Sequence, residues 1–369
     1  MPVPMTPYRR GVVTVDSVRP MTGSLELAWF AALCDDDHEQ LGVPAPHLVS
    51  SYEHCADIVH AADEAGFDAI LMPSGYALGI DTIAFASAVA RSTRHIRPIV
   101  AVRTGEVWAP QLARQLATLD QLLQGRLIVN VISSELPGET LESAPRYART
   151  LEHMRALRTL LDGQALCADG EWVHVDVEPP RIRTVSGQCP PLYFGGLSDD
   201  ARDVAAREAD MYLMWPDTYD NVRGIVDDLA ARAAVHGRTL RFGYRVHVVV
   251  RPTEAEARAA AQHLVAALDP EVGDSIRAKS LDSQSVGVRA QTALRESAAD
   301  DGFVEPQLWT GIGRARSGCG AAIVGDPQQV ADKISSYRAL GIDTFVLSGY
   351  PHVDECRRFA DLVMPLLRA

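Results

Sequence analysis

The stretch Arg241-Phe-Gly-Tyr-Arg-Val-His-Val-Val-Val250 is an apolar strand candidate that carries two basic side chains in its second half. Side chains alternate between the two faces of a strand, so Arg245 and His247 are expected to point to the same face. An unpaired cation is costly to bury, and the pair therefore needs a compensating partner or a cavity that receives an anion. We interpret this strand as the polar floor of an active site.

On both sides of this strand, short apolar runs alternate with helical patterns along nearly the whole chain, which is typical of βα units around a parallel sheet. The eight strand candidates are Leu25–Leu33, Ala69–Ser74, Ile96–Arg103, Leu127–Ser134, Pro191–Gly195, Met211–Trp215, Arg241–Val250 and Thr344–Ser348. The predicted helices are Ser51–Gly66, Asp81–Ser92, Pro110–Gly125, Tyr147–Leu161, Ser198–Ala209, Tyr219–Gly237 and Val353–Leu367. Eight units predict an α/β fold of the TIM (β/α)8 barrel type, with its chemistry at the carboxyl ends of the strands. A doubly wound open sheet ranks second, because no G-x-G-x-x-G sequence follows the first strand.

Three segments depart from this rhythm. Residues 1–24 precede the first strand and are expected to be a surface arm or disordered. Residues near 135–190 contain an alternating stretch, Glu171–Val177, that predicts a small hairpin outside the main sheet. Residues 270–320 show no clear pattern, and we expect an irregular active-site lid or a packed excursion there. Residues 25–369 are thus expected to form a single barrel domain with two insertions.

Composition excludes several classes of partner. The chain has 369 residues and a net charge of −13, and it lacks the basic face that nucleic acid or an anionic membrane surface would require. It contains no run of about 18 uncharged apolar residues and no apolar secretion signal at its start, which predicts a cytoplasmic protein. Its six cysteines are scattered without C-x-x-C spacing, so we expect free thiols and no metal site.

Four runs in the second half of the chain carry a resemblance to a known family. They are Leu192-Tyr-Phe-Gly-Gly-Leu-Ser198, Arg241-Phe-Gly-Tyr-Arg-Val-His247, Leu308-Trp-Thr-Gly-Ile-Gly313 and Gly341-Ile-Asp-Thr-Phe-Val-Leu-Ser-Gly-Tyr-Pro-His352. Together they resemble the FMNH2-dependent alkanesulfonate monooxygenases, which belong to the bacterial luciferase-like flavoproteins. The segment Ala117–Arg126 is similar to one found more widely in that superfamily. The resemblance covers roughly residues 25–367 and implies a TIM barrel with an insertion.

The resemblance implies catalytic roles for Arg245, His247, Tyr350 and Arg316, the last on a mobile lid. It also implies substrate contacts for Trp215, His352, Leu78 and Cys34. These residue types suit the chemistry, because an Arg can hold a sulfonate through two parallel N–H bonds. A His or Tyr beside the reacting groups can donate or relay a proton.

A flavin phosphate would need a separate anion site. The run Gly195-Gly-Leu-Ser198 ends a strand where a helix begins, and unpaired N–H groups at a helix start can bind phosphate. The flavin-binding residues that the resemblance implies are Asn130, Ser133, Tyr147, Gly196, Leu197 and Ser198.

The chain departs from the family at three positions. Leu78, Cys34 and Ser143 stand where the resemblance gives Cys, His and His. Tyr76 and Leu78 predict a pocket that is more apolar, or differently shaped, than that of an enzyme for short alkanesulfonates.

The function implied is a two-component monooxygenase that uses O2 and takes FMNH2 from a separate NAD(P)H-dependent flavin reductase. Its substrate would be an organosulfur compound, with C–S cleavage to an aldehyde and sulfite if that compound is a sulfonate. The alternatives are a monooxygenase of another small metabolite, such as a sulfone or a biosynthetic intermediate, a deazaflavin-dependent oxidoreductase, and a flavin-binding protein without turnover. A homodimer or homotetramer is expected from the resemblance.

Overall fold

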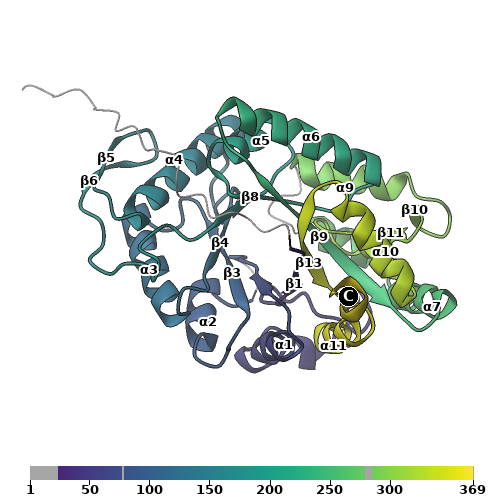
Figure 1. Ribbon diagram of the computed structural model, residues 1–369. Coiled ribbons are helices and arrows are strands. Elements are labelled where there is room, and N and C mark those ends of the chain that lie inside the picture. Colours follow the sequence, from purple (N-terminus) through teal and green to yellow (C-terminus); the bar gives the residue numbers. More distant parts are fainter. Residues whose placement is uncertain (1–23, 77–78, 279–284, 369) are drawn as a thin grey trace, which may run out of the picture.

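Eight parallel strands close into a barrel that is surrounded by helices in the computed structural model, which describes residues 24–76, 79–278 and 285–368 (Figure 1). The strands of the barrel, in ring order, are β1 (Glu26–Phe30), β2 (Ala69–Met72), β3 (Arg97–Arg103), β4 (Ile128–Ile132), β7 (Leu192–Phe194), β8 (Met211–Met214), β9 (Arg241–Val250) and β13 (Ile342–Ser348). The ring closes because β13 pairs with both β9 and β1. The TIM-barrel prediction is confirmed, and seven of the strand candidates contain one of these strands, while the eighth, Thr344–Ser348, covers all of β13 except its first two residues. The open-sheet alternative is wrong.

The helices follow the strands as βα units require. They are α1 (Tyr52–Glu64), α2 (Thr82–Val89), α3 (Ala109–Leu122), α4 (Ser143–Leu161), α5 (Asp199–Glu208), α6 (Tyr219–Val235), α7 (Glu254–Val265), α10 (Pro327–Arg338), α11 (His352–Leu362) and α12 (Met364–Arg368), with a short 3-10 turn, η1 (Pro46–Leu48). Ser51 caps α1 and Ser198 caps α5, each accepting a hydrogen bond from a backbone N–H of the first turn. The helices α7 and α10 were missed by the sequence analysis.

The predicted hairpin is present outside the barrel. Strands β5 (Leu166–Asp169) and β6 (His174–Val177) pair antiparallel in a separate two-stranded sheet. In Figure 1 this hairpin projects from the α3 and α4 side of the barrel.

The expectation of an irregular segment over residues 270–320 is wrong. The described part of the segment contains α8 (Pro270–Ala278), α9 (Val286–Glu296), β10 (Phe303–Glu305), β11 (Leu308–Trp309) and the 3-10 turn η2 (Gly311–Arg314), and β12 (Ala322–Gly325) follows. The strands β10 and β11 have only three and two residues, and such short elements give weak periodic signals. Strand β12 pairs with β9 over His247–Val250, beyond the part of β9 that pairs with β8. The insertion therefore extends the sheet alongside the outer half of β9.

Inside the barrel, polar layers lie above and below an apolar layer. Ala28, Phe30, Leu71, Ile99 and Val346 belong to the buried apolar cluster between the strands. A set of charged side chains lies below this apolar layer and closes the amino end of the barrel. A second set of charged side chains lies above the layer at the carboxyl end. Among the described residues, no helix has the length and apolar character needed to cross a membrane.

Candidate active site

The second half of β9 supplies the floor of the carboxyl-end site. Strand β8 pairs with β9 only as far as Tyr244, whereas β13 stays paired until Ser348 lies opposite His247. The guanidinium of Arg245 lies 4.4 Å above the Phe30 ring, and Ser348 Oγ lies 2.7 Å from His247 Nδ1. Both basic side chains thus contact the last residues of barrel strands, Arg245 that of β1 and His247 that of β13, as the alternation of side chains predicts.

Arg245 is a buried cation without an ion-pair partner among the described residues. The residue is only 3% exposed to solvent. Nη1 donates to the backbone oxygen of Val246 at 3.1 Å, while Nη2 is buried and has no hydrogen-bond partner in the described part of the chain. Burial lowers the pKa of Arg245 below its usual value. An arrangement that leaves a buried N–H group unpaired is costly unless a ligand completes it.

Arg316, in contrast, has its charge balanced. The residue lies between η2 and β12 and forms an ion pair with Asp36 in the loop after β1. Its Nη1 also donates to the hydroxyl of Tyr350 at 3.0 Å, and that hydroxyl donates to Asp36 Oδ1 at 2.7 Å. Burial alone would raise the pKa of Asp36, but Arg316 holds it below the usual value. Burial and the Asp36 charge raise the pKa of Tyr350 well above 10, so it remains a neutral donor.

His247 is buried and connects the other groups. Its Nε2 lies 3.2 Å from the backbone oxygen of Cys319 and 3.3 Å from Arg316 Nη1, so it can donate to the carbonyl or accept from the guanidinium. Burial, followed by the charges of Arg245 and Arg316, lowers the pKa of His247 well below 6.5. The imidazole is therefore neutral at pH 7. It can pass a proton from the group bonded to one ring nitrogen to the group bonded to the other.

The loop after β1 is held in place by a second buried acid. Asp37 accepts a hydrogen bond from the backbone N–H of His352 at 3.0 Å, and its other oxygen lies 2.9 Å from His54 Nε2. His352 Nε2 in turn lies 3.0 Å from the backbone oxygen of Asp36. The sequence analysis missed Asp36, Asp37 and Ser348. The run of three acids from Asp35, directly after the first strand, is the signal that could have found two of them.

Three of the remaining substrate-site candidates are described by the structure. Cys34 follows β1, and burial together with Asp36 raises the pKa of its thiol to about 12. The Trp215 ring follows β8 and lies so close to Gly318 that a Cβ there would be 3.3 Å from it. Tyr76 is 72% exposed, and Leu78 lies outside the described residues. Trp215 therefore contacts the inserted segment, while Tyr76 belongs to the surface.

The start of α5 fits an anion such as the flavin phosphate. A Cβ at Gly196, whose φ is 147°, would lie 3.1 Å from the Tyr147 hydroxyl, and one at Gly195 would overlap the carbonyl oxygen of Leu213. Only glycines fit this turn, which brings the backbone close to the hydroxyl of Tyr147. Leu197 packs against the core, and Ser198 caps the helix. The helix start therefore offers N–H groups at the place where the resemblance puts a phosphate.

The other flavin-site candidates lie beside this turn. Asn130 is on β4 opposite Tyr193 of β7, and Ser133 follows β4 with its hydroxyl 3.5 Å from the backbone oxygen of Arg146. Ser143 begins α4, and its hydroxyl donates to Asp200 at 2.8 Å, which joins the starts of α4 and α5. All of these residues belong to the carboxyl ends of β4 and β7 or to the helices that follow.

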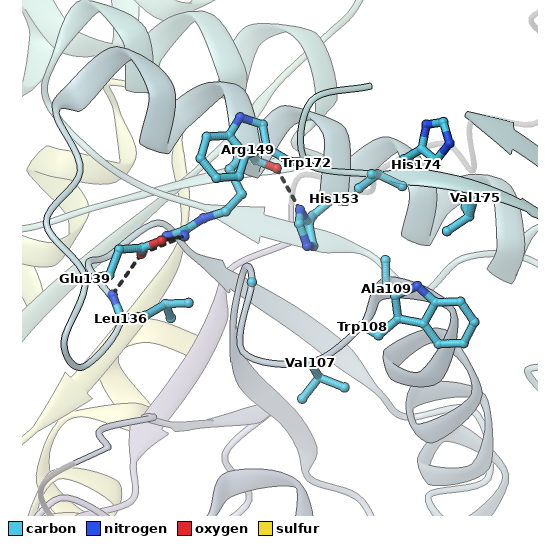
Figure 2. Close-up of a pocket in the computed structure, with 12 residues that line it drawn as sticks. Val107, Trp108, Ala109, Leu136, Glu139, Arg149, His153, Trp172, His174 and Val175 are labelled. Atoms are coloured by element: carbon cyan, nitrogen blue, oxygen red, sulfur yellow. Dashed lines mark hydrogen bonds and ion pairs between the residues drawn. The ribbon is translucent and has the colours of Figure 1, made fainter. Parts of the chain in front are cut away.

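A cavity of about 430 Å³ lies away from these groups, between the start of α3, the middle of α4 and the hairpin (Figure 2). It is lined in part by Trp108, His153 and Trp172. None of the predicted site residues lines it. Its buried cation, Arg149, is paired with both carboxylate oxygens of Glu139 at 2.9 and 2.7 Å. The cation that lacks a carboxylate partner among the described residues is instead Arg245, at the carboxyl end of the barrel.

Comparison with known proteins agrees with this fold. Residues 26–344 match the family described as luciferase-like monooxygenase. The chain is 60% identical over 347 residues to the sulfoquinovose monooxygenase of Novosphingobium aromaticivorans, covering 92% of this chain and 96% of the relative. It is 49% identical over 346 residues to that of Agrobacterium fabrum, covering 93% and 90%. The EDTA monooxygenase of a Chelativorans species shares the fold, with a TM-score of 0.76, 18% identity and coverage of 94% and 93%.

These matches decide how far the resemblance drawn from the sequence holds. The luciferase-like superfamily is confirmed, whereas the narrower likeness to alkanesulfonate monooxygenases is not established, because the two relatives with high identity are sulfoquinovose monooxygenases. An oxygenase is supported over a flavin-binding protein without turnover. The chain belongs to the luciferase-like monooxygenase family and is a flavin-dependent monooxygenase built on a TIM barrel.

Proposed function

We propose that this protein is a two-component monooxygenase that uses FMNH2 and O2 to cleave the C–S bond of sulfoquinovose. Sulfoquinovose is a hexose that carries a sulfonate in place of its terminal hydroxyl, so cleavage would give sulfite and a sugar aldehyde. The proposal is supported by the identity to two sulfoquinovose monooxygenases over more than nine-tenths of the chain. The observation that carries it is the buried guanidinium of Arg245 at the carboxyl end of the barrel, whose Nη2 has no hydrogen-bond partner among the described residues.

The charges at this end match a single anionic group. Arg316 and Asp36 balance each other, and His247 and Tyr350 are neutral. Asp37 lies against His54 and the backbone of His352, so among the described residues Arg245 is left without a carboxylate partner. A sulfonate carries the one negative charge that would pair with it. A sulfonate oxygen bound to Nη2 of Arg245 would satisfy both the charge and the unpaired N–H group.

The residues around Arg245 have the capacity to move protons. Ser348 and His247 form a hydrogen-bonded pair whose far nitrogen reaches Arg316, so a proton can be relayed along buried groups. Tyr350 can donate a proton to a reacting oxygen while Arg316 and Asp36 hold its hydroxyl in position. Burial of these side chains keeps water away and strengthens the electrostatic interactions between them.

We assign the flavin phosphate to Gly196, Leu197, Ser198 and Tyr147, with Asn130 and Ser133 beside the ring system. Reduced FMN bound there would supply the electrons that activate O2. The crowding at Gly195 and Gly196 supports this assignment, because each backbone lies closer to its neighbours than a side chain would permit. Trp215, His352, Leu78 and Cys34 are proposed to shape the substrate side of the pocket.

We also propose that Arg316 lies on a lid formed by the inserted segment, residues 270–320. The lid would carry Arg316 over the bound substrate. The proposal is supported by the contacts of Arg316 with residues that follow β1 and β13, at Asp36 and Tyr350.

A separate NAD(P)H-dependent flavin reductase, a homodimer or homotetramer, and a cytoplasmic location complete the proposal. The reductase is needed because the chain has no G-x-G-x-x-G sequence after its first strand that would bind a nicotinamide cofactor. Size-exclusion chromatography with light scattering would test the oligomer.

Sulfite release tests the proposed function. The purified protein would be incubated with FMN, a generic flavin reductase, NADPH and sulfoquinovose, and sulfite would be compared with a reductase-only control. We expect release well above the control. No release, with oxygen still consumed on addition of a sulfone or another small metabolite, would keep the oxygenase but remove the sulfonate substrate.

A further inference from the structure

Asp36 places a negative charge beside the site that is proposed to receive a sulfonate. It forms an ion pair with Arg316, whose guanidinium lies 5.6 Å from the same Phe30 ring that Arg245 covers. A carboxylate so close to an anion site repels a sulfonate and weakens its binding. Asp36 balances Arg316, and its place beside the anion site also makes it a candidate for contact with the rest of the substrate.

The carboxylate of Asp36 has hydrogen-bonding capacity left over. Its Oδ1 accepts from Tyr350 and its Oδ2 accepts from Arg316. A carboxylate offers about four lone-pair sites, so these two bonds leave about half of them available. The Asp36 side chain is 14% exposed, in contrast to Arg245 at 3%. A ligand whose anionic end reaches Arg245 would therefore leave its remaining part near Asp36, on the side of the solvent.

The position of Asp36 is fixed by its surroundings. Its backbone oxygen lies 3.0 Å from His352 Nε2, and the next residue, Asp37, accepts a hydrogen bond from the His352 backbone. His38, on the other side, brings its ring nitrogen 3.9 Å from Asp36 Oδ1. A carboxylate held from both sides loses little conformational freedom when it binds a ligand.

We propose that Asp36 is a specificity-determining residue that accepts hydrogen bonds from hydroxyl groups of the substrate and so selects a polyhydroxylated sulfonate over an alkanesulfonate. This inference rests on the proposed function and names the residue that recognises the sugar part of the substrate. Hydroxyl donors offset the repulsion that Asp36 exerts on the sulfonate, because they bind an ionised acceptor. An alkanesulfonate has no such donors on its alkyl chain, so no hydrogen bond offsets the repulsion of its sulfonate.

The competing explanation is that Asp36 only positions Arg316. The two explanations differ in one measurable quantity. A residue that merely holds Arg316 affects every sulfonate equally, since all of them present the same anionic group. A residue that binds hydroxyls affects the sugar sulfonate and leaves the alkanesulfonate unharmed or improved.

The experiment compares Asp36→Asn and Asp36→Ala with the unmodified protein, with FMN and a flavin reductase present. Values of kcat/KM for sulfite release would be measured with sulfoquinovose and with hexanesulfonate, and the latter would be measured as a competitive inhibitor if it is not turned over. Glu39→Gln is the matched control, because it removes an acid from the same loop. The Glu39 side chain is 66% exposed and pairs with His47. We expect the preference for sulfoquinovose to fall about 10- to 100-fold in Asp36→Ala, and less in Asp36→Asn, but to stay constant in Glu39→Gln.

The results separate this inference from the function on which it rests. An equal loss with both sulfonates, leaving the preference unchanged, would overturn the assignment of Asp36 while the desulfonating function stands. Absence of sulfite release from sulfoquinovose by the unmodified protein would instead overturn the proposed function itself.

Discussion

Two arginines on one face of β9 have opposite surroundings. At the amino end of the barrel, Arg241 donates to both oxygens of Asp343 at 2.9 Å and lies 3.4 Å from Glu26. At the carboxyl end, Arg245 has no carboxylate partner among the described residues, and its Nη2 is unpaired. Although burial opposes it, Asp343 raises the pKa of Arg241, whereas burial lowers that of Arg245. The protein thus supplies carboxylate partners for the arginine at the amino end of the strand. The arginine at the carboxyl end keeps an N–H group for a ligand.

The charge balance of the two barrel ends shows the same difference. The amino end contains the acids Glu26 and Asp343 and the bases Arg97 and Arg241, so its charges cancel. At the carboxyl end, Arg316 pairs with Asp36, and Asp37 lies against His54 and the His352 backbone, whereas Arg245 has no carboxylate partner among the described residues. An internal ion-pair network stabilises a fold without a ligand, while an excess charge in a buried place indicates a binding site. Substituting these residues one at a time tests the difference between the two ends.

Arg245→Met tests the ligand-binding end and should have the largest effect. We expect kcat/KM for sulfite release from sulfoquinovose to fall by about 1,000-fold or more, since two charged hydrogen bonds of about 1.5–3 kcal/mol each are lost. The free energy of unfolding should stay the same or rise, because an unpaired buried cation is removed. Steady-state kinetics and urea denaturation measure the two quantities. Unchanged kinetics would show that the sulfonate binds elsewhere.

Arg241→Met is the matched substitution at the amino end. It leaves Asp343 and Glu26 without their common cation, and breaking a buried ion pair in this way costs about 3–5 kcal/mol of stability. Urea denaturation should therefore show a large loss of stability, while kcat/KM per folded molecule changes little. An equal pattern of effects for Arg241→Met and Arg245→Met would contradict the distinction between the two ends.

Arg316→Ala tests whether the inserted segment acts as a lid. We expect kcat/KM to fall by about 100-fold, or about 3 kcal/mol, because Tyr350 loses its donor and the anion loses its second guanidinium. The affinity for FMN, measured by fluorescence titration, should stay unchanged, since the proposed phosphate site lies at α5. Turnover that survives the substitution would remove the lid from the mechanism.

Substitution of His247 should give the smallest effect, a change in how the free energy of unfolding depends on pH. Its folded-state pKa lies below the unfolded value near 6.5, so as pH falls below about 6.5 only the unfolded chain gains the proton. Stability is therefore fully present above pH 6.5 and is lost as the pH falls, by up to about 1.4 kcal/mol per pH unit. In His247→Gln, the decline between pH 6.5 and 5 should be shallower by about 1 kcal/mol. Parallel curves for the two proteins would show that His247 titrates normally.

The fold was largely predictable because repeated local patterns encode it. Eight apolar runs alternate with amphipathic ones, and serines such as Ser51 and Ser198 mark helix starts. The shared face of Arg245 and His247 follows from the period of two alone. The strands of residues 270–320 could not be predicted, because β11 has only two residues and β10 only three, too few to show an alternating pattern.

The partners in the site were harder to predict than the strand residues. Asp36 and Arg316 lie far apart in the chain, and their ion pair exists because β12 pairs with β9 and only β13 separates β9 from β1 in the sheet. A run of three acids gives no indication of which one turns inward. The sequence marked the cations, but the structure was needed to show that one is balanced and the other is not.

A crystal structure with sulfoquinovose and FMN bound would test the central claim most directly. The account predicts a sulfonate oxygen within about 3 Å of Arg245 Nη2, the buried group that has no hydrogen-bond partner in the part of the chain that the structure describes. A sulfonate bound in the cavity beside Trp108 and Trp172, or at the barrel mouth without contact to Arg245, would contradict it.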